Sequence, residues 1–477
     1  MPEPANTVIG YVVDVQGNML TASLVEDEQG RAPTVTIGDE DILVGQIGSY
    51  VAIRQNDVNI VAIVTRMTEQ EALAAPTIET PGEDTARLPF AKRIARLTPI
   101  GSIRADGQFD RGVGRYPTTG AEVHALGSAD IAKMFERFQS KGFSVGTVAT
   151  HPSLKVCLDP SNLFGRHFAI LGQTGSGKSW TVAALVQRTV AVMPRAHIII
   201  LDLHGEYCWK REDGTRHYAF ANAIVRHVDA RELEIPYWLM TYAELCDLLI
   251  ERSEREATNQ TAFFRDCLLE GRQTENSSAT PALGLPRVTV DTPIYFSLDD
   301  VISKVRAKNV ERVGNRQGPM FGDFDRFLMR IESKLNDTRY DFLLKPTKRN
   351  SSASLSAMLR DFVGLGAQKA AVTVIDLSSV PFDVRPTVAA QIGRLAFEFN
   401  YWNPKYREFP ILLICEEAHA YIPRASESQF AGSRKSMERL AKEGRKYGVG
   451  LAVVSQRPHE VSETVLAQCG TFICLRI

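Results

Sequence analysis

The sequence predicts an α/β protein: a parallel sheet with helices on both faces, preceded by a small all-strand unit and interrupted by a helical insertion. Three observations carry this prediction: short apolar runs after residue 150, helical patterns between them, and short alternating strands near the amino terminus. Short continuous apolar runs are typical of buried parallel strands. The predicted core strands are residues 167–171, 197–202, 371–376, 411–415 and 449–455. A chain of 477 residues is long enough for this core and for further domains.

The amino-terminal strands predict a small β-barrel. Residues 8–15 and 19–24 flank the turn pair Gly17-Asn18, which is a hairpin pattern. Further short strands are expected at 34–37, 50–53 and 59–64, the last two on either side of the turn 55–57, and a linker rich in Pro, Thr and Glu follows at 75–82. The predicted domains are a barrel at 1–95, the first part of the core at 96–235, a helical subdomain at 236–360 and the second part of the core at 361–477.

Helix signals mark the inserted subdomain. Thr241 and Glu244 form a capping box, and Ser297 with Asp300 opens another helix. The stretch 273–278 is expected to be a polar loop between the helices. A third helix is indicated by apolar side chains at helical spacing, namely Phe324, Phe327, Leu328, Ile331 and Leu335.

Composition favours a cytoplasmic protein without membrane contact. The content of 44% hydrophobic and 23% charged residues is ordinary for a globular chain. The longest apolar runs, such as 198–201 and 411–415, are too short to cross a bilayer, and the first residues lack a signal-peptide pattern. Seven cysteines without a Cys-x-x-Cys pair indicate neither disulfides nor a zinc site. Because the net charge is only −1, binding of nucleic acid would require a local basic lining.

The strongest motif is Gly172-Gln-Thr-Gly-Ser-Gly-Lys178-Ser179, which lies between a predicted strand and a predicted helix. This spacing is that of a P-loop, which binds ATP and Mg²⁺. The loop amides would hold the phosphates, Lys178 would neutralise their charge and the Ser179 hydroxyl would bind Mg²⁺. The predicted nucleotide-binding residues are Gly172, Thr174, Gly175, Ser176, Gly177, Lys178 and Ser179.

Two acids end the strand 411–415. Since a buried strand cannot hold unpaired carboxylates, Glu416 and Glu417 should lie at its carboxyl end. We expect Glu416 to hold the Mg²⁺ shell, together with Ser179, and Glu417 to orient the attacking water. The run Glu-Glu-Ala-His also resembles the box of two-lobed helicases, but residues 418–477 leave no room for a second lobe. A single lobe is expected to borrow part of its site from a neighbouring chain.

Other polar groups follow neighbouring strands. Asp202, His204 and Glu206 come directly after the strand 197–202, where either a catalytic role or a turn satisfied by its own hydrogen bonds is possible. Their spacing fits no standard zinc pattern, and Glu206 is held as a second candidate for orienting water. Gln456 ends the last core strand and suits a γ-phosphate sensor, although strand-terminal amides are also ordinary.

The segment 433–448 is basic, and most of it is expected to be a solvated helix face. Its basic residues are Arg434, Lys435, Arg439, Lys442, Arg445 and Lys446. Gly444 and Gly448 place Arg445 at a helix end, from which it could act in a neighbouring subunit's ATP site. Arg439 is the alternative, and a plain surface arginine remains open for either.

Taken together, these motifs resemble HerA-type hexameric DNA translocases, of the HerA/FtsK branch of P-loop ATPases. The resemblance spans about residues 150–477 and the barrel, and it rests on the P-loop, Asp202-x-His-Gly-Glu-Tyr207, Cys-Glu-Glu-Ala-His419, Glu443-Gly-Arg-Lys-Tyr-Gly448 and Val-Ser-Gln-Arg-Pro458. Residues 471–477 fall in an expected strand, where members of the family usually continue.

The resemblance implies a RecA-like core and rings of six subunits that thread double-stranded DNA through a pore, using ATP. It also implies a partner: a nuclease in end resection, or a sirtuin-type or nuclease effector in anti-phage defence, docked on the barrel. A nucleic-acid pump of conjugation or a secretion ATPase is a second hypothesis, which the lack of a membrane segment disfavours. A third is an ATP-gated ring scaffold that activates an effector without moving along DNA.

Overall fold

The computed structural model forms two compact units, residues Met1–Asp159 and Pro160–Ile477. The described residues are 7–26, 34–55, 58–71, 91–104, 108–139, 142–149, 151–220, 223–229, 232–251, 255–278, 283–366, 369–424 and 431–476. The predicted linker at 75–82 lies outside them, as does most of the turn at 55–57. Among the described residues, no helix combines the length and the apolar character needed to cross a bilayer.

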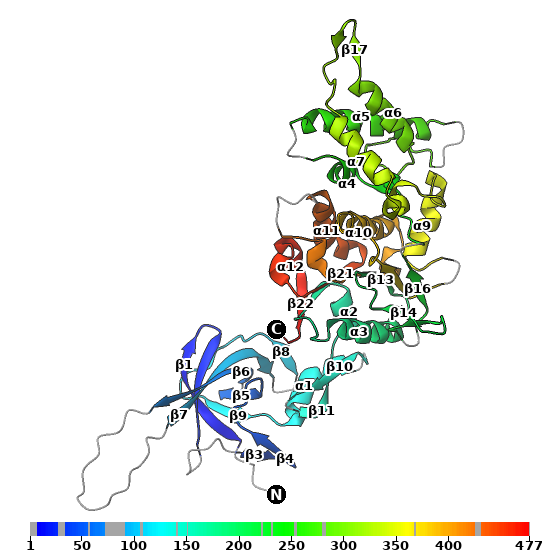
Figure 1. The fold of residues 1–477 in the computed structure, drawn as a ribbon. Helices are drawn as coiled ribbons and strands as arrows, with labels where there is room; N and C mark the ends of the chain where they lie inside the picture. Colours follow the sequence, from blue (N-terminus) through cyan, green and yellow to red (C-terminus); the bar gives the residue numbers. More distant parts are fainter. Residues whose placement is uncertain are drawn as a thin grey trace, which may run out of the picture. The chain divides into compact units, whose positions relative to one another are not determined.

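The amino-terminal unit contains the predicted barrel (Figure 1). Six strands close it in the order β2-β1-β9-β5-β6-β7, with β7 pairing back to β2. Their bounds are β1 Val8–Gln16, β2 Met19–Leu24, β5 Tyr50–Gln55, β6 Val58–Glu71, β7 Ala91–Ile103 and β9 Glu122–Ala125. The predicted hairpin is present, since Gln16 pairs with Met19 and Gly17 adopts a φ of 58°. Closure removes free strand edges and leaves alternate side chains to fill the interior.

The predicted barrel limit at residue 95 falls inside β7, so residues 96–125 belong to the barrel rather than to the ATPase core. The physical reason is strand length: β7 pairs with β6 along its whole course, from Ala91 to Ile103. Besides the six barrel strands, this unit contains one helix, a hairpin, a short strand that pairs with β7 and a further short strand pair. These are α1 Ser128–Gln139, β10 Ser144–Val148, β11 His151–Cys157, β8 Phe109–Arg111, β3 Thr34–Ile37 and β4 Glu40–Leu43.

The second unit is built on a parallel sheet of seven strands, in the order β16-β19-β13-β20-β21-β12-β22. The α/β prediction is therefore confirmed: the five expected core strands are present, the strand expected at 471–477 forms one lateral edge, and one strand that was not expected, at 225–228, forms the other. The bounds are β12 His167–Leu171, β13 His197–Asp202, β16 Val225–Val228, β19 Val372–Asp376, β20 Ile411–Cys415, β21 Val449–Ser455 and β22 Cys469–Cys474. All neighbouring pairs are parallel, so every strand delivers its carboxyl end to one edge.

Strand order decides which loops meet at that edge. β12 lies beside β21, with Leu171 opposite Ser455, and β21 lies beside β20. β13 lies on the other side of β20. The loops after these four strands are consequently neighbours, and the long helices α3 (Lys178–Val192), α10 (Arg385–Trp402) and α11 (Ala431–Glu443) connect or cover the strands.

A helical subdomain interrupts the sheet between β16 and β19 (Figure 1). Its main helices are α4 Tyr242–Leu249, α5 Ala257–Asn276, α6 Leu298–Asn309, α7 Asp325–Leu335 and α9 Leu355–Phe362. Both predicted caps form: Thr241 and Glu244 make the complete capping box of α4, and the Ser297 side chain accepts from Asp300 N. A short hairpin, β17 (Arg312–Val313) with β18 (Arg316–Gln317), joins α6 to α7.

The predicted loop at 273–278 is wrong, because α5 continues through Asn276. Tertiary contacts outweigh the polar composition there. The Arg272 side chain is fully buried and donates to the carbonyls of Val290, Trp238 and Met240. A helix anchored one residue before the polar stretch is extended by its own backbone bonds at little cost.

The capping box gives a stability test. Replacing Thr241 by Ala leaves the Glu244 amide without its side-chain acceptor, which should cost about 1 kcal/mol. We expect the thermal unfolding midpoint of the chain to fall by about 2 °C, measured by circular dichroism. Thr258→Ala, at an exposed position of α5, is the matched control and should change little. An equal midpoint for both variants would contradict the role of the cap.

Candidate nucleotide-binding site

The loop between β12 and α3 has the backbone of a P-loop. Gly175 and Gly177 adopt φ angles of 76° and 94°, which favour glycine strongly. A Cβ at either position would meet no atom within 4 Å, so the loop presents open space over these residues. At Gly172, by contrast, a Cβ would lie 2.5 Å from Ser176 Oγ. Gly175 and Gly177 are thus favoured by their backbone conformation, and Gly172 is favoured because a side chain there would collide with Ser176.

Lys178 begins α3 with its side chain turned back under the loop. It is 8% exposed, and its Nζ donates to the carbonyl oxygen of Gln173 at 3.1 Å. An ammonium has three donors, so two remain for anionic oxygens. Together with the free amides at the start of the helix, this makes the loop a site for phosphate.

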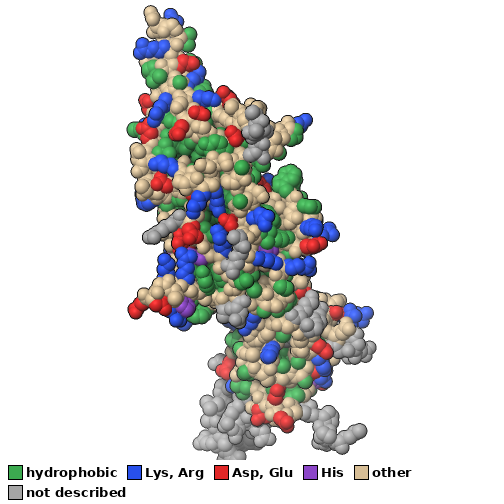
Figure 2. Space-filling view, turned by 90° about the vertical axis from the view of Figure 1, so that its right-hand side faces the viewer, with side chains coloured by type: hydrophobic (Ala, Val, Ile, Leu, Met, Phe, Trp, Pro, Cys, Tyr) green, Lys and Arg blue, Asp and Glu red, His purple; other side chains and the backbone are tan. Residues whose placement is uncertain are grey.

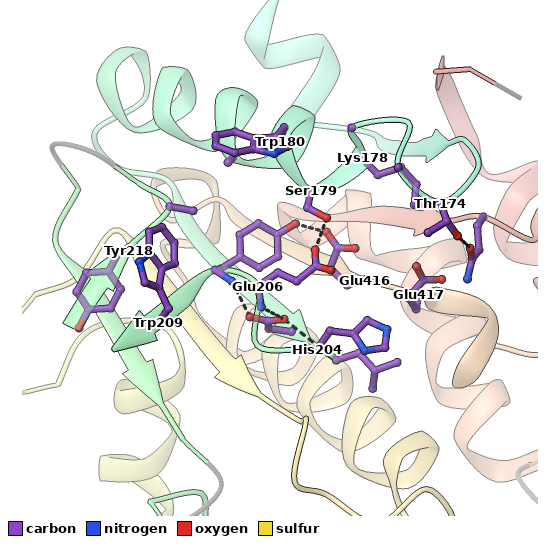
Figure 3. A pocket seen from close by; sticks show the side chains of 18 of the residues that line it. Thr174, Lys178, Ser179, Trp180, His204, Glu206, Trp209, Tyr218, Glu416 and Glu417 are labelled. Carbon is purple, nitrogen blue, oxygen red and sulfur yellow. Dashed lines mark hydrogen bonds between the residues drawn. The ribbon is translucent and has the colours of Figure 1, made fainter. Parts of the chain in front are cut away.

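A cavity of about 770 Å³ opens beside the loop. Figure 3 shows Lys178, Ser179 and Thr174 along one side of it, with Glu206, Glu416 and Glu417 facing them. The volume lies within the range of about 300–1,000 Å³ that ligand sites usually have. All of the predicted acids therefore meet the P-loop in one cavity, although β13 and β20 deliver them from different parts of the chain.

Glu417 has an unusual backbone. Its φ of 46° is the only positive value of a non-glycine residue among those described. A left-handed conformation costs about 1–3 kcal/mol and is found mainly where function needs it. It turns the chain out of β20 and directs the carboxylate toward the loop side of the cavity, 3.3 Å from His419 Nδ1. His419 in turn lies 3.2 Å from Ser455 Oγ on β21.

Glu416 is buried, with its side chain beneath the cavity. The Tyr207 hydroxyl donates to its carboxylate, and the Tyr421 hydroxyl donates to its backbone carbonyl. Burial raises the pKa of Glu416 to about 7, and the nearby charges of Glu206 and Asp202 add to that rise, whereas the bond from Tyr207 opposes it. A bound cation would reverse this balance by favouring the carboxylate.

Asp202 holds the turn after β13. Its carboxylate accepts from four backbone amides, those of residues 204, 205, 206 and 207, at distances of 2.8–3.3 Å. Burial raises the pKa of Asp202 and these hydrogen bonds lower it. The self-satisfied turn that the sequence left open is therefore present, with the Asp202 carboxylate as its acceptor.

The same turn brings Glu206 to the P-loop helix, where Ser179 Oγ donates to its carboxylate. Mg²⁺ in nucleotide sites is usually held by one or two carboxylates, a hydroxyl, phosphate oxygens and water. Among the described residues, no group of three or more His, Cys, Asp or Glu side chains forms a metal site by itself. Ser179 with Glu206 and Glu416 accordingly fits a metal ion that shares its ligands with a phosphate, and not a free-standing metal centre.

Gln456 lies between the two halves of the site. Thr174 Oγ1 donates to its side-chain oxygen, so the amide at the end of β21 contacts the tip of the P-loop. Sequence reasoning gave no role to Tyr207, His419 or the aromatic side chains Trp180, Trp209 and Tyr218, all of which lie in or beside the cavity. Tyr207 and His419 lie inside motifs that carry the family resemblance. Trp180, Trp209 and Tyr218 belong to no motif, and their spacing follows no helix or strand period that would single them out.

Arg445 is not part of this cavity. It lies in a short 3₁₀ turn, Gly444–Tyr447, which ends at Gly448 with a φ of 71°. Arg445 is exposed near His167, at the amino end of β12. The P-loop follows the carboxyl end of the same strand, so the two lie at opposite ends of the sheet's strands. Arg439 instead pairs with Glu443 at 3.4 Å and lies over the Phe397 ring.

Comparison with known proteins identifies the family. The sequence profile of "Helicase HerA, central domain" matches residues 143–396, which is more than half of the chain. This protein belongs to the HerA helicase family. Similar proteins include the DNA double-strand break repair helicase HerA of Pyrococcus furiosus, 28% identical over 388 residues, which cover 76% of this chain and 65% of that one. The corresponding Sulfolobus acidocaldarius protein is 24% identical over 478 residues, covering 98% of this chain and 83% of that one.

Coverage differs among these HerA relatives. The chain spans 55% of the Saccharolobus solfataricus DNA double-strand break repair helicase HerA, at 26% identity over 66% of its own length. Among solved structures, VirB4 of Thermoanaerobacter pseudethanolicus aligns with a TM-score of 0.41 at 17% identity, covering 68% of this chain and 80% of that one. The family match and the loop geometry agree that the chain carries a P-loop nucleotide-binding site.

Removing the lysine tests the phosphate site. Lys178→Ala deletes the buried cation, and we expect ADP affinity to fall by about tenfold to a hundredfold. Isothermal titration calorimetry with Mg²⁺ present would measure this. Lys405→Ala, which removes an exposed lysine outside the cavity, is the matched control. Wild-type ADP affinity in Lys178→Ala would refute the assignment of the loop.

Proposed function

We propose that this HerA family member is an ATP-driven homohexameric motor that moves double-stranded DNA through a central pore. The observation that carries the proposal is the gathering of Glu206, Glu416 and Glu417 around the P-loop in one cavity. Its relatives are named DNA double-strand break repair helicases, which supports DNA as the substrate. The chain offers one such site and one ATPase lobe among its described residues, so motion requires several copies.

Each site residue then has a distinct role. Ser179 and Glu416 hold the shell of Mg²⁺, and the contact between Ser179 and Glu206 favours a share of that shell for Glu206. Lys178 and Mg²⁺ neutralise the β- and γ-phosphates. Glu417 orients the attacking water, and the His419 ring lies 3.3 Å from its carboxylate on the side of β21. Gln456 senses the γ-phosphate and couples its presence to β21, because its side chain contacts Thr174 of the P-loop.

Arg445 completes the site of the next subunit. Phosphoryl transfer develops charge on the γ-phosphate, and a second cation there increases the rate by roughly 10³–10⁵-fold. Arg445 cannot serve its own P-loop, because the two lie at opposite edges of one sheet. It is exposed, and no ion pair or hydrogen bond of its side chain is seen within the described part of the chain. Arg439 is a weaker candidate, since Glu443 and Phe397 already engage it.

DNA must bind at a limited region of the surface, because the surface as a whole carries no large positive charge. On the face in Figure 2, Lys and Arg side chains are interspersed with Asp and Glu, in keeping with the net charge of −1. We therefore assign DNA contact to the pore of the ring and partner docking to the barrel, which carries no P-loop element. A nuclease or sirtuin-type effector, in end processing or anti-phage defence, is the partner class that fits such a division of labour.

The alternative is an ATP-gated ring that scaffolds an effector without moving along DNA. A triplex-displacement assay separates the two functions. A motor should strip a third strand from duplex DNA with ATP, and duplex DNA should increase its rate of ATP hydrolysis. We expect both results for the wild-type chain and neither for Lys178→Ala. If duplex DNA does not change the rate of ATP hydrolysis and intact rings do not displace the third strand, the motor function is contradicted and the scaffold is favoured.

Subunit mixing tests the place of Arg445. Glu417→Gln should bind ATP without cleaving it, and Arg445→Ala should lose most activity for want of the second cation. Co-assembled rings of the two inactive proteins should recover part of the ATPase rate, because some interfaces then hold both intact groups. Lys446→Ala, which removes the neighbouring exposed cation, is the control and should stay active. No recovery in rings shown to be mixed would argue against action in trans.

A further inference from the structure

One end of the nucleotide cavity is aromatic. Trp180, Trp209 and Tyr218 line it, and Figure 3 shows all three at the end away from Thr174 and Glu417. Trp180 is 83% exposed and Trp209 is 47% exposed. Tryptophan is normally well buried, so two exposed indoles at one cavity mouth leave a large apolar surface open to solvent.

Trp209 and Tyr218 come from a hairpin that is anchored to the site. Strands β14 (Cys208–Lys210) and β15 (Arg216–Tyr218) pair with Trp209 opposite His217, and these two rings stack with centroids 6.4 Å apart. The hairpin begins directly after Tyr207 and returns to it, since Ala219 N donates to the Tyr207 carbonyl at 3.0 Å. It is thus held by the same turn that carries Glu206.

The P-loop helix forms the other wall of this end. Trp180, Ala183 and Gln187 line the cavity at positions i, i+3 and i+7 of α3, which is one face of a helix. Gln187 Nε2 donates to the carbonyl of Ala219 at 2.7 Å and ties α3 to the hairpin. From Lys178 to Gln187 the helix rises by about 13 Å, enough for a nucleoside to extend from the phosphates along this wall.

We propose that Trp180, Trp209 and Tyr218 bind the base of the nucleotide, so that the aromatic end sets affinity for the nucleoside part of ATP. The proposal rests on the proposed ATPase function and adds the residues that hold the base. When Lys178 and Ser179 bind the phosphates, the nucleoside extends from them toward Trp180, because Glu417 and Gln456 line the opposite end of the cavity. A flat aromatic base then meets aromatic side chains, on which it stacks favourably whatever its identity.

The test separates the base from the phosphates by using two probes, ADP and inorganic tripolyphosphate, each with Mg²⁺. Stacking on one aromatic side chain is worth about tenfold to a hundredfold in affinity. We expect Trp209→Ala and Trp180→Ala to weaken ADP by that factor and to leave tripolyphosphate binding unchanged. Trp402→Ala removes a tryptophan that is 77% exposed on α10, outside the cavity, and should alter neither affinity. Calorimetry on the full chain measures all four proteins, with sedimentation as a check of assembly.

Each other result overturns the assignment. Unchanged ADP affinity in both variants would show that the base lies elsewhere. A parallel loss of ADP and tripolyphosphate would mean that the substitutions disturb the P-loop and not a base contact. Loss of assembly with normal ADP affinity would place the indoles at a subunit interface. A wild-type chain that binds neither probe would instead contradict the proposed ATPase function itself, which is a distinguishable failure.

Discussion

The four hydrogen bonds that the Asp202 carboxylate accepts from the turn 204–207 are the interaction on which the site depends. A buried carboxylate is costly unless backbone donors surround it, and here they also fix the path of the chain. Because the turn is fixed, Glu206 reaches Ser179 and Tyr207 reaches Glu416. The hairpin with Trp209 follows from the same point. One buried carboxylate thus positions both Glu206 and the aromatic end of the cavity.

Sheet topology supplies the rest of the arrangement. Placing β21 between β12 and β20 puts Gln456 and Ser455 between the P-loop and the two acids. His419 lies between Glu417 and Ser455 of that strand, and Gln456 at its end contacts the P-loop through Thr174. Ligands of open parallel sheets bind at this carboxyl side, where the loops that leave neighbouring strands lie next to one another. The amino ends of the strands present Arg445, which our proposal assigns to the ATP site of a neighbouring copy.

Much of this could be predicted from the sequence. The P-loop, the acids after 411–415 and the caps at Thr241 and Ser297 are local patterns, and local patterns survive folding. The loop expected at 273–278 failed because a buried Arg272, bonded to distant carbonyls, extends the helix. The barrel limit predicted at residue 95 is wrong, because the length of β7 depends on its pairing with β6, which local sequence patterns do not show. The contacts of Tyr207 and His419 and the place of Trp209 in the cavity escaped prediction for the same reason: they depend on elements that are separate in the sequence.

The central claim is that one sheet edge binds the nucleotide and the opposite edge of a neighbouring copy completes the site around DNA. Electron cryomicroscopy of the purified chain, with a non-hydrolysable ATP analogue and duplex DNA, tests it most directly. The account predicts six-membered rings with duplex density in the pore, nucleotide against Lys178, and Arg445 of the adjacent subunit facing the γ-phosphate. Monomers with nucleotide bound, or rings whose interfaces keep Arg445 away from every nucleotide, would contradict it.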